Sequence, residues 1–485
     1  MQRNIHIIER QLFEINMVDR NNPSQVKEKL SSYCSQKLLP AIETLFDKQV
    51  KSDRIYRAGR IVIDVGRLPV ENWENRLIEH VLDKLSFYLS SAVSVSGTTD
   101  SATMTEESNV MVGVKKEEEI IESVFRFLET GTLPWYSSIR NNKDLDEAFL
   151  EITREKAVLE NLIRLFQKNK NVLERFVMQA GDVLMIDILK KKNIEKSTIS
   201  EISVRWEPYF DIAGISPQEQ QLKIYVALFL HLDEPGTLRN PESRAKYIAR
   251  QFSLDQLRII SSALNHKTNI HLDDSNLNRE IRKLISSKKK TENKPGSLIK
   301  EHRIAGTVEK SSEAGTQIEE SWYISNSGLV LFNPFLKSLF EKLGYQEKDI
   351  WVSTEMQQHA VHLLQYLVTG EESKAEFDLV LNKILTGYQL GKPLPKNIVL
   401  DQPVKKEADV LVEAMIGHWK ALKNTSIKGL RTTFLQREGK LTRKTGGWLL
   451  QVEQKTVDIL LEKIPWGFSV IKTPWMQKLM HVEWV

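Results

Sequence analysis

Residues 440–454 read Lys-Leu-Thr-Arg-Lys-Thr-Gly-Gly-Trp-Leu-Leu-Gln-Val-Glu-Gln. Apolar and polar side chains alternate on both sides of Gly446-Gly447, which is the pattern of a β-hairpin. Two further short strands are expected at 468–471 and 480–484. Together these segments predict a small antiparallel sheet near the C-terminus, whereas most other patterns in the chain are helical. The expected fold class is therefore mostly α with minor β (α+β): helical modules plus this small sheet.

The hairpin lies in the tryptophan-rich part of the chain. Residues 321–485 contain seven of the 10 tryptophans, and helical patterns cover 329–343, 354–370, 405–422 and 427–436. A tryptophan has a large apolar area and one N–H donor, so it suits a tight core or a buried interface. Core packing is the more common of these two roles. The candidate packing or partner-contact residues in this C-terminal domain are Trp419, Arg431, Trp466, Trp475 and Trp484.

Upstream of this domain, the patterns predict four segments. Residues 1–90 form an N-terminal α+β module, in which helical patterns flank the β-branched run 60–66 that predicts a strand. Residues 91–116 are small, polar and aperiodic, which is typical of a flexible linker. Residues 117–285 form a helical region that begins with an acidic first turn and a helix ending at Gly131. Its short helices in pairs suggest a solenoid-like stack without a fixed repeat.

The fourth segment, residues 286–320, is predicted to be a basic linker. Residues 279–303 carry nine basic and three acidic side chains, and Lys288, Lys289 and Lys290 stand at the centre. One interpretation is an arm that contacts an acidic surface, and the other is a solvated linker. No aromatic residue interleaves with the lysines, as a channel for single-stranded nucleic acid would require, so the linker is the more common outcome.

Composition and length exclude several classes of protein. The chain has 485 residues, of which 41% are hydrophobic and 27% charged, a balance that supports a sizeable core and two to four domains. A net charge of +4 is too small to indicate a polyanionic partner by itself. Cys34 is the single cysteine, which excludes an intrachain disulfide. Charges precede any apolar run at the N-terminus and no run approaches membrane-spanning length, so neither a secretory signal nor membrane insertion is expected.

A search for catalytic motifs finds none. His359 and His362 lie at i and i+3 on a predicted helix, but zinc needs a third ligand, and packing is the more common role of such a pair. Asp64 after the 61–63 run is more often a turn residue than a lone catalytic carboxylate. Cys34 lies on an apolar helical stripe and is expected to be a core thiol. No phosphate-binding loop and no nucleophile elbow occurs. The sequence therefore predicts no enzyme and no cofactor.

An ordered series of blocks in the C-terminal domain carries a family resemblance. The longest are Ser-Gly-Leu-Val-Leu-Phe-Asn-Pro-Phe-Leu-Lys-Ser-Leu-Phe-Glu-Lys-Leu-Gly at 327–344 and His-Ala-Val-His-Leu-Leu-Gln-Tyr-Leu-Val-Thr-Gly at 359–370. The others lie at 381–387, 418–426, 429–439, 464–467, 471–476 and 482–484, with further blocks at 6–11, 61–66 and 127–135. This series resembles the tape measure family of contractile injection systems, which are phage-tail-like particles.

The resemblance implies a non-enzymatic structural or assembly protein that sets or assists the length of the inner tube. Its implied partners are the inner tube protein, a baseplate hub or spike, and a tube terminator or cap, with no nucleic acid; an oligomer is also open. The implied location is the cytoplasm during assembly and then the inside of the tube. A tube-end, cap or baseplate adaptor of the same particle, or a general helical scaffold, is the alternative, because glycines, prolines and the hairpin interrupt any single helical rod.

Overall fold

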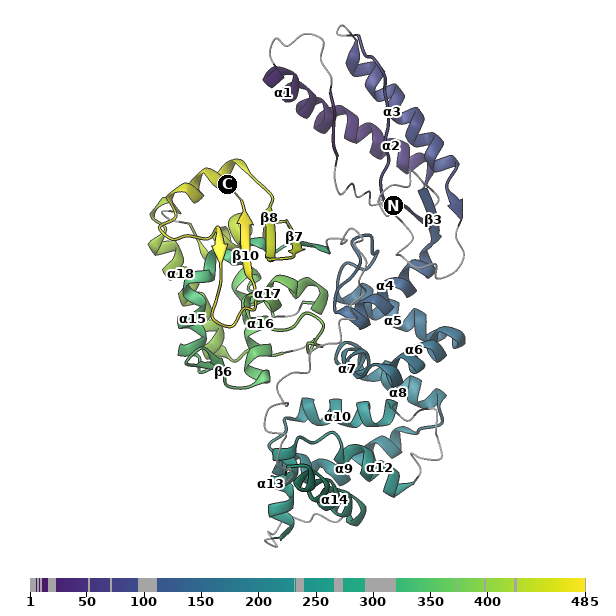
Figure 1. The fold of residues 1–485 in the computed structure, drawn as a ribbon, viewed down its shortest axis with the longest axis vertical. Coiled ribbons are helices and arrows are strands. Elements are labelled where there is room, and N and C mark those ends of the chain that lie inside the picture. Colours follow the sequence, from purple (N-terminus) through teal and green to yellow (C-terminus); the bar gives the residue numbers. More distant parts are fainter. Residues whose placement is uncertain are drawn as a thin grey trace. The chain divides into compact units, whose positions relative to one another are not determined.

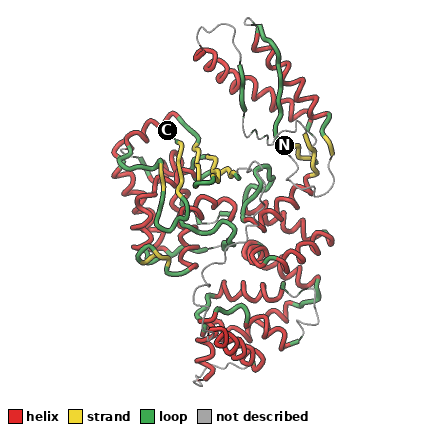
Figure 2. The backbone as a smooth tube through the Cα atoms, viewed as in Figure 1, coloured by secondary structure: helices red, strands yellow, loops and turns green. Residues whose placement is uncertain are grey.

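The structure of the chain, a computed structural model, describes most of the residues. The described residues are 6, 8, 11–15, 23–50, 53–69, 72–94, 111–230, 232, 240–265, 274–292, 320–372, 374–396, 398–422 and 425–484. They fall into two compact units, of which unit 1 holds residues 1–123 and 136–139 and unit 2 holds 124–135 and 140–485. Helices dominate and the strands form small sheets (Figures 1 and 2), so the predicted α+β class is confirmed. The five modules read from the sequence remain a prediction.

Unit 1 is built on two helical arms that run in the same direction, since Tyr33 bonds Glu74 and, further along both arms, Gln49 bonds Ser86. The bounds of its first helices are α1 Pro23–Tyr33, the π-helical turn η1 Cys34–Leu38, α2 Leu39–Gln49 and α3 Trp73–Ser90. Cys34, Leu38 and Ile42 on the first arm pack against Leu77 and Val81 of α3. Cys34 is thus a buried free thiol, as its position on the apolar stripe predicted.

A small sheet completes unit 1. Its strands are β1 Arg54–Ala58, β2 Val93–Ser94 and β3 Met111–Lys115, and helix α4 Lys116–Thr130 follows at once. Strand β3 lies in the middle, antiparallel to β1 and parallel to β2. Strands therefore occupy both ends of the stretch 91–116 that was expected to be a linker, and residues 95–110 lie outside the described part of the chain.

The prediction of a strand at 60–66 is wrong, because the segment is not assigned to a sheet. Residues 59–69 have no helix or strand assignment, although Ile61, Ile63 and Val65 pack on the apolar core of unit 1 while Val62 is exposed. The alternation of β-branched residues specifies an extended backbone with one buried face, but it does not provide a neighbouring strand. The carboxylate of Asp64 accepts the N–H of Gly66 at 2.8 Å, which is the turn role expected for it.

The first part of unit 2 is an array of short helices that pack on helices close to them in the sequence, such as α6 on α7 and α12 on α14 (Figure 1). Their bounds are α5 Asn142–Arg154, α6 Lys156–Lys168, α7 Lys170–Gln179, α8 Asp182–Lys191, α9 Lys196–Ile212, α10 Pro217–Phe229, α12 Pro241–Ala249, α13 Leu254–Asn265 and α14 Ser275–Glu292. The side chains of Asn141, Asn169 and Ser216 accept backbone N–H groups at the N-termini of α5, α7 and α10, which fixes the residue at which each of these helices begins. Helix α14 includes residues 286–292 of the predicted basic linker, whose remainder up to residue 319 lies outside the described residues.

The rest of unit 2 holds helices in the predicted segments 329–343, 354–370, 405–422 and 427–436, and further helices at 376–385 and 456–463 that were not predicted. Their bounds are η3 Ser327–Phe332, α15 Asn333–Lys342, α16 Thr354–Thr369, η4 Glu376–Leu379, α17 Val380–Leu385, α18 Gln402–His418, η5 Lys420–Leu422, α19 Ile427–Leu430, η6 Arg431–Leu435 and η7 Thr456–Lys463. A short hairpin, β5 Gln346–Glu347 and β6 Ile350–Trp351, joins α15 to α16. Leu331, Leu364 and Leu381 are fully buried in the apolar core that these helices share.

The main sheet of unit 2 has five strands in the order β4-β7-β8-β10-β9. Their bounds are β4 Ser321–Ile324, β7 Gly439–Lys444, β8 Gly447–Val452, β9 Val470–Ile471 and β10 Leu479–Glu483. The predicted hairpin is confirmed, since β7 and β8 pair antiparallel around Thr445-Gly446. The sheet is mixed rather than wholly antiparallel, because β10 pairs parallel to β8. The long connection through η7 returns the chain to the same end of the sheet, which a parallel pair requires.

Candidate functional site

The tryptophans named from the sequence point into unit 2. Trp419 and Trp484 are fully buried, whereas Trp466 and Trp475 are half-buried. The indole N–H groups donate from Trp419 to Leu460 O (3.0 Å), from Trp466 to Leu331 O (3.0 Å), from Trp475 to Leu385 O (2.7 Å) and from Trp484 to Asp458 Oδ2 (3.2 Å). Each ring therefore links two distant chain segments. A contact with a partner at these residues remains a prediction.

Arg431 also acts within unit 2. Its guanidinium pairs with Asp409 at 2.9 Å and donates to the carbonyl of Leu367 at 3.1 Å, near the C-terminus of α16. Gly370 ends that helix with φ +78, and a Cβ there would lie 2.9 Å from Arg431 Nη1. The arginine thus secures a helix end. Lys288, Lys289 and Lys290 lie on the backbone of α14, and their side chains fall outside the described part of the structure.

The two histidines lie in packed surroundings on α16. His362 is fully buried on α16, and its Nε2 lies 2.9 Å from the carbonyl oxygen of Pro395. Burial lowers the pKa of His362 to about 4, and it also lowers the pKa of His359, which packs edge-on against Tyr345. Within the described ranges, no three His, Cys, Asp or Glu side chains are grouped to hold a metal ion. The pair therefore has the packing role.

A buried charge cluster is the most distinctive polar site of unit 2. Glu376 of η4 accepts from Arg175 of α7 at 3.1 Å and from Lys383 of α17 at 2.5 Å, all at the same carboxylate oxygen. The three side chains are at most 1% exposed. A buried ion pair is costly to form and very costly to break on one side, since the remaining charge cannot reach water. We call these three residues the charge cluster.

The charge cluster has one more cation than anion. Burial lowers the pKa of Lys383, although the carboxylate of Glu376 beside it favours the charged form. Further N–H groups of both cations donate to backbone carbonyls. Among these bonds, Arg175 Nη1 donates to Leu128 O in α4. Carbonyl dipoles thus replace the water that both cations lost on burial.

The charge cluster also holds the loop that we call the carbonyl loop, residues 390–395. Two prolines in this stretch lack an N–H and prevent regular structure. Side chains from elsewhere donate instead to each of its successive carbonyls. The bonds are Lys383 to Leu390 O (3.1 Å), Arg175 to Gly391 O (2.7 Å), Lys383 to Lys392 O (3.1 Å), Tyr388 to Pro393 O (2.6 Å), Gln179 to Leu394 O (2.8 Å) and His362 to Pro395 O (2.9 Å).

The end of α4 fits closely against the charge cluster. Gly131, the C-cap predicted from the sequence, has φ +79, and a Cβ at this position would lie 2.6 Å from Glu376 Oε1 and 3.1 Å from Arg175 Nη2. Next to it, the rings of Phe127 and Phe377 meet edge to face at 5.9 Å. Helices α4 and α7, which are early in the chain, are thereby locked to η4 and α17, which follow some 200 residues later. This arrangement joins chain segments and offers no reactive group to a substrate.

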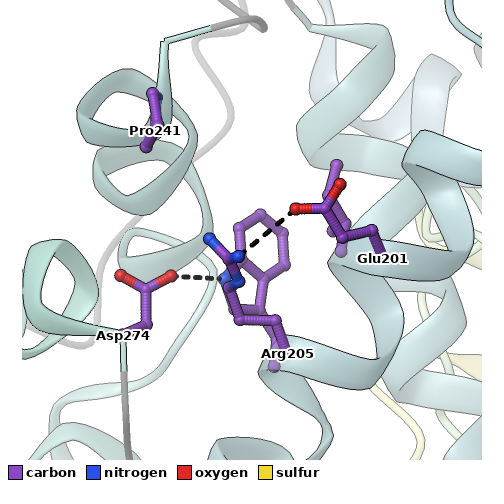
Figure 3. A pocket seen from close by; sticks show the side chains of 6 residues that line it. Glu201, Arg205, Pro241 and Asp274 are labelled. Carbon is purple, nitrogen blue, oxygen red and sulfur yellow. Dashed lines mark hydrogen bonds and ion pairs between the residues drawn. The ribbon is translucent and has the colours of Figure 1, made fainter.

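The pocket drawn in Figure 3 is a small depression. It lies between α9, α12 and the start of α14, and it is lined by Glu201, Ile202, Arg205, Trp206, Pro241 and Asp274. Arg205 pairs with Glu201 at 3.3 Å, and the indole N–H of Trp206 donates to Asp274 at 3.3 Å. The polar groups of the depression therefore already bind one another.

Sequence reasoning missed the charge cluster. Arg175 and Glu376 are 201 residues apart, and Lys383 has no special neighbour in the sequence. The available signal was the pair Pro393 and Pro395, which marks an irregular loop whose carbonyls must be satisfied from outside.

Comparison with known proteins identifies the family. Among the described residues, no helix is long and apolar enough to cross a membrane. No curated protein and no solved structure matches the chain. The family model for the contractile injection system tape measure protein matches residues 5–484, which is nearly the whole chain and includes both units. The chain therefore belongs to the contractile injection system tape measure protein family, and its role is structural, in setting tube length.

Proposed function

We propose that the chain sets inner-tube length from inside the tube, in contact with the inner tube protein along its course and with a baseplate hub or spike at one end. The observation that carries this proposal is the family match, which extends through both units and not through one module alone. The family associates with the tube of the particle, and the choice of partners within the tube is our proposal. A terminator or cap would be met at the other end.

The proposed role needs no chemistry. The polar groups of the charge cluster and of the tryptophans are turned toward the chain itself. We therefore propose that the protein is not an enzyme, that it is assembled into the particle in the cytoplasm and that it then lies within the tube.

The geometry favours a length standard made of folded parts in series. The longest helices among the described residues, α3 and α14, have 18 residues each. A helix rises about 1.5 Å per residue, so neither is longer than about 27 Å. The charge cluster and the carbonyl loop would keep unit 2 from separating while the tube grows around it.

Deletion and co-sedimentation test this role. In a strain without the chain, we expect electron micrographs to show no tubes or tubes of unregulated length. A tagged wild-type chain should sediment with sheathed tubes and stay with them in a density gradient. Normal tubes of normal length in the deletion strain would contradict the proposed function.

The lysines of the basic segment provide a second test. If Lys288, Lys289 and Lys290 contact an acidic tube surface, reversal of all three to glutamate should weaken binding to purified tubes. Added salt should weaken wild-type binding and have less effect on the variant. Reversal of Lys143, Lys156 and Lys170, which lie on α5 to α7, is the matched control. Equal tube binding by the two variants would favour a plain linker at 286–320.

A further inference from the structure

The extended segment of unit 1, residues 60–66, has the form of a strand, but it pairs with no other strand among the residues that the structure describes. Ile61, Ile63 and Val65 face the core formed by α1, α2 and α3, while the side chain of Val62 is 51% exposed and Asp64 is also exposed. β-Branched side chains at every other position, with one face buried, are typical of a sheet strand. Gly66 ends the segment with φ +63.

One side of this segment has unused backbone groups. The N–H and C=O of alternate residues in a strand point to the same side, so those of Ile61, Ile63 and Val65 share an edge. Within the described part of the chain, none of these three residues has a backbone hydrogen bond. An unpaired edge with an apolar sequence is a template for another strand, and natural proteins cover such edges or protect them with charges.

We propose that this edge accepts the same segment of a second copy of the chain, antiparallel and centred on Ile63. The sequence Ile61-Val-Ile-Asp-Val65 is nearly symmetric about its middle residue. In this register Ile63 faces Ile63 of the second copy, and Ile61 faces Val65 of that copy in both directions. Each of these three pairs is a hydrogen-bonded pair that exchanges two N–H···O bonds, so the register uses all the unpaired groups of that edge.

The charges of the exposed face favour the same register. Arg60 and Asp64 lie on that face with Val62. In the centred antiparallel pair, Arg60 lies opposite Gly66 of the second copy and diagonal to its Asp64, within reach of a long side chain. The two-fold axis generates this ion pair twice, which makes the interface isologous. A strand from an unrelated protein would not be expected to match both the charge order and the centre of symmetry.

Disulfide trapping in the full chain tests the register. Residues 62 and 64 of opposite copies form a non-hydrogen-bonded pair about 4.5 Å apart between Cα atoms, which a disulfide can bridge. Two positions 62 are diagonal, about 7–8 Å apart, which is too far. A mixture of differently tagged Val62→Cys and Asp64→Cys chains should therefore cross-link under mild oxidation. Each variant alone, and the wild-type chain with its buried Cys34, should cross-link much less.

Charge exchange tests the same interface without cysteines. Asp64→Arg should raise the dissociation constant of the dimer, measured by analytical ultracentrifugation, by roughly threefold to tenfold through the two lost exposed pairs. The double variant Arg60→Asp with Asp64→Arg should restore dimerisation. Like Asp64→Arg alone, it lacks the hydrogen bond from the N–H of Gly66 to the Asp64 carboxylate. Hydrogen exchange should show the amides of Ile61, Ile63 and Val65 protected as protein concentration rises.

Three results would overturn the proposal. The first is a wild-type chain that stays monomeric at every concentration. The second is cross-linking of Val62→Cys with itself as efficient as with Asp64→Cys, which would indicate another register. The third is protection of residues 61–65 that depends on added tube protein and not on the concentration of the chain, which would assign the edge to another partner.

Discussion

At Glu376 one carboxylate faces two cations in a fully buried site. Both Arg175 and Lys383 donate to it, and none of the three side chains is more than 1% exposed. Removing the negative charge leaves two buried cations beside each other. Glu376→Gln should therefore lower the free energy of unfolding of unit 2 by about 3–5 kcal/mol. Chemical denaturation followed by tryptophan fluorescence measures this change.

The matched control is a glutamate in an exposed ion pair. Glu147 lies 3.7 Å from Lys143 on α5, and both side chains are more than half exposed. Glu147→Gln should change stability by less than about 0.5 kcal/mol, the usual contribution of a helix-surface pair. If Glu376→Gln has as small an effect as Glu147→Gln, the charge cluster does not hold the segments together.

His362 gives unit 2 a dependence on pH. Burial lowers the pKa of His362 from 6.5 to about 4, so the folded state binds fewer protons than the unfolded state between these values. The contribution of His362 to the folding stability of unit 2 is therefore fully present above pH 6.5. As the pH falls toward 4, this group decreases the free energy of unfolding by an amount on the order of 3 kcal/mol. Melting curves at both pH values should show that His362→Gln loses less stability on acidification than the wild type.

Asp378 changes the stability of unit 2 with pH in the opposite direction. Burial raises the pKa of Asp378 from 3.8 to about 6, so its folded form binds more protons and acidification through that range stabilises it. The difference between His362→Gln and the wild type separates the two groups, because both chains retain Asp378. Parallel stability profiles for the two chains would show that His362 is not the titrating group.

At the scale of the elements, the packing of helix α4 depends on Gly131, the residue that ends it. Gly131 has φ +79 and no room for a side chain, because a Cβ would lie 2.6 Å from Glu376 Oε1. Gly214 after α9 has a similar φ of +67 but nothing within 4 Å of its Cβ position. Gly214→Ala should cost about 1–2 kcal/mol from the backbone conformation alone. Gly131→Ala should cost clearly more, because the charge cluster must shift as well.

Thermal unfolding of both glycine variants measures this comparison. The predicted order is wild type, then Gly214→Ala, then Gly131→Ala, from highest to lowest melting temperature. A melting temperature for Gly131→Ala equal to that of Gly214→Ala would show that the end of α4 is not packed against the charge cluster.

Local patterns predicted most elements of the fold. The hairpin around Gly446 and most helices between 329 and 436 follow from residue periodicity, which depends only on near neighbours. The pairing of β10 parallel to β8 depends on the path of a long connection, which periodicity does not contain. For the same reason, the alternation at 61–65 indicated an extended segment but not whether a second strand lies beside it.

The hydrogen-bond partners at the polar sites could not be predicted from residue periodicity. The packing of Trp419 and Trp484 follows from their size and apolar area, but the carbonyl of Leu460 and the carboxylate of Asp458 that receive their N–H groups do not. Arg175 appears in the sequence as one arginine on a helix. Its role depends on Glu376, which is brought to it only by the complete fold. Long-range electrostatic partners therefore need the structure.

For the molecule as a whole, the central claim is that a chain made of short helices sets a length. A single continuous helix of 485 residues would span about 730 Å. The described residues instead form two compact units with their own apolar cores. The length standard is then the sum of the folded parts, and a change in the size of one part should change the length of the tube.

Insertion between strands β2 and β3 is the most direct measurement of this claim. About 20 helix-forming residues placed within 95–110 leave both strands intact and could add about 30 Å if helical. A flexible polar insert of equal length is the control. The account predicts that tube length in electron micrographs increases in proportion to one, two and three helical inserts. Tubes of unchanged length in all three strains, with assembly still dependent on the chain, would contradict it.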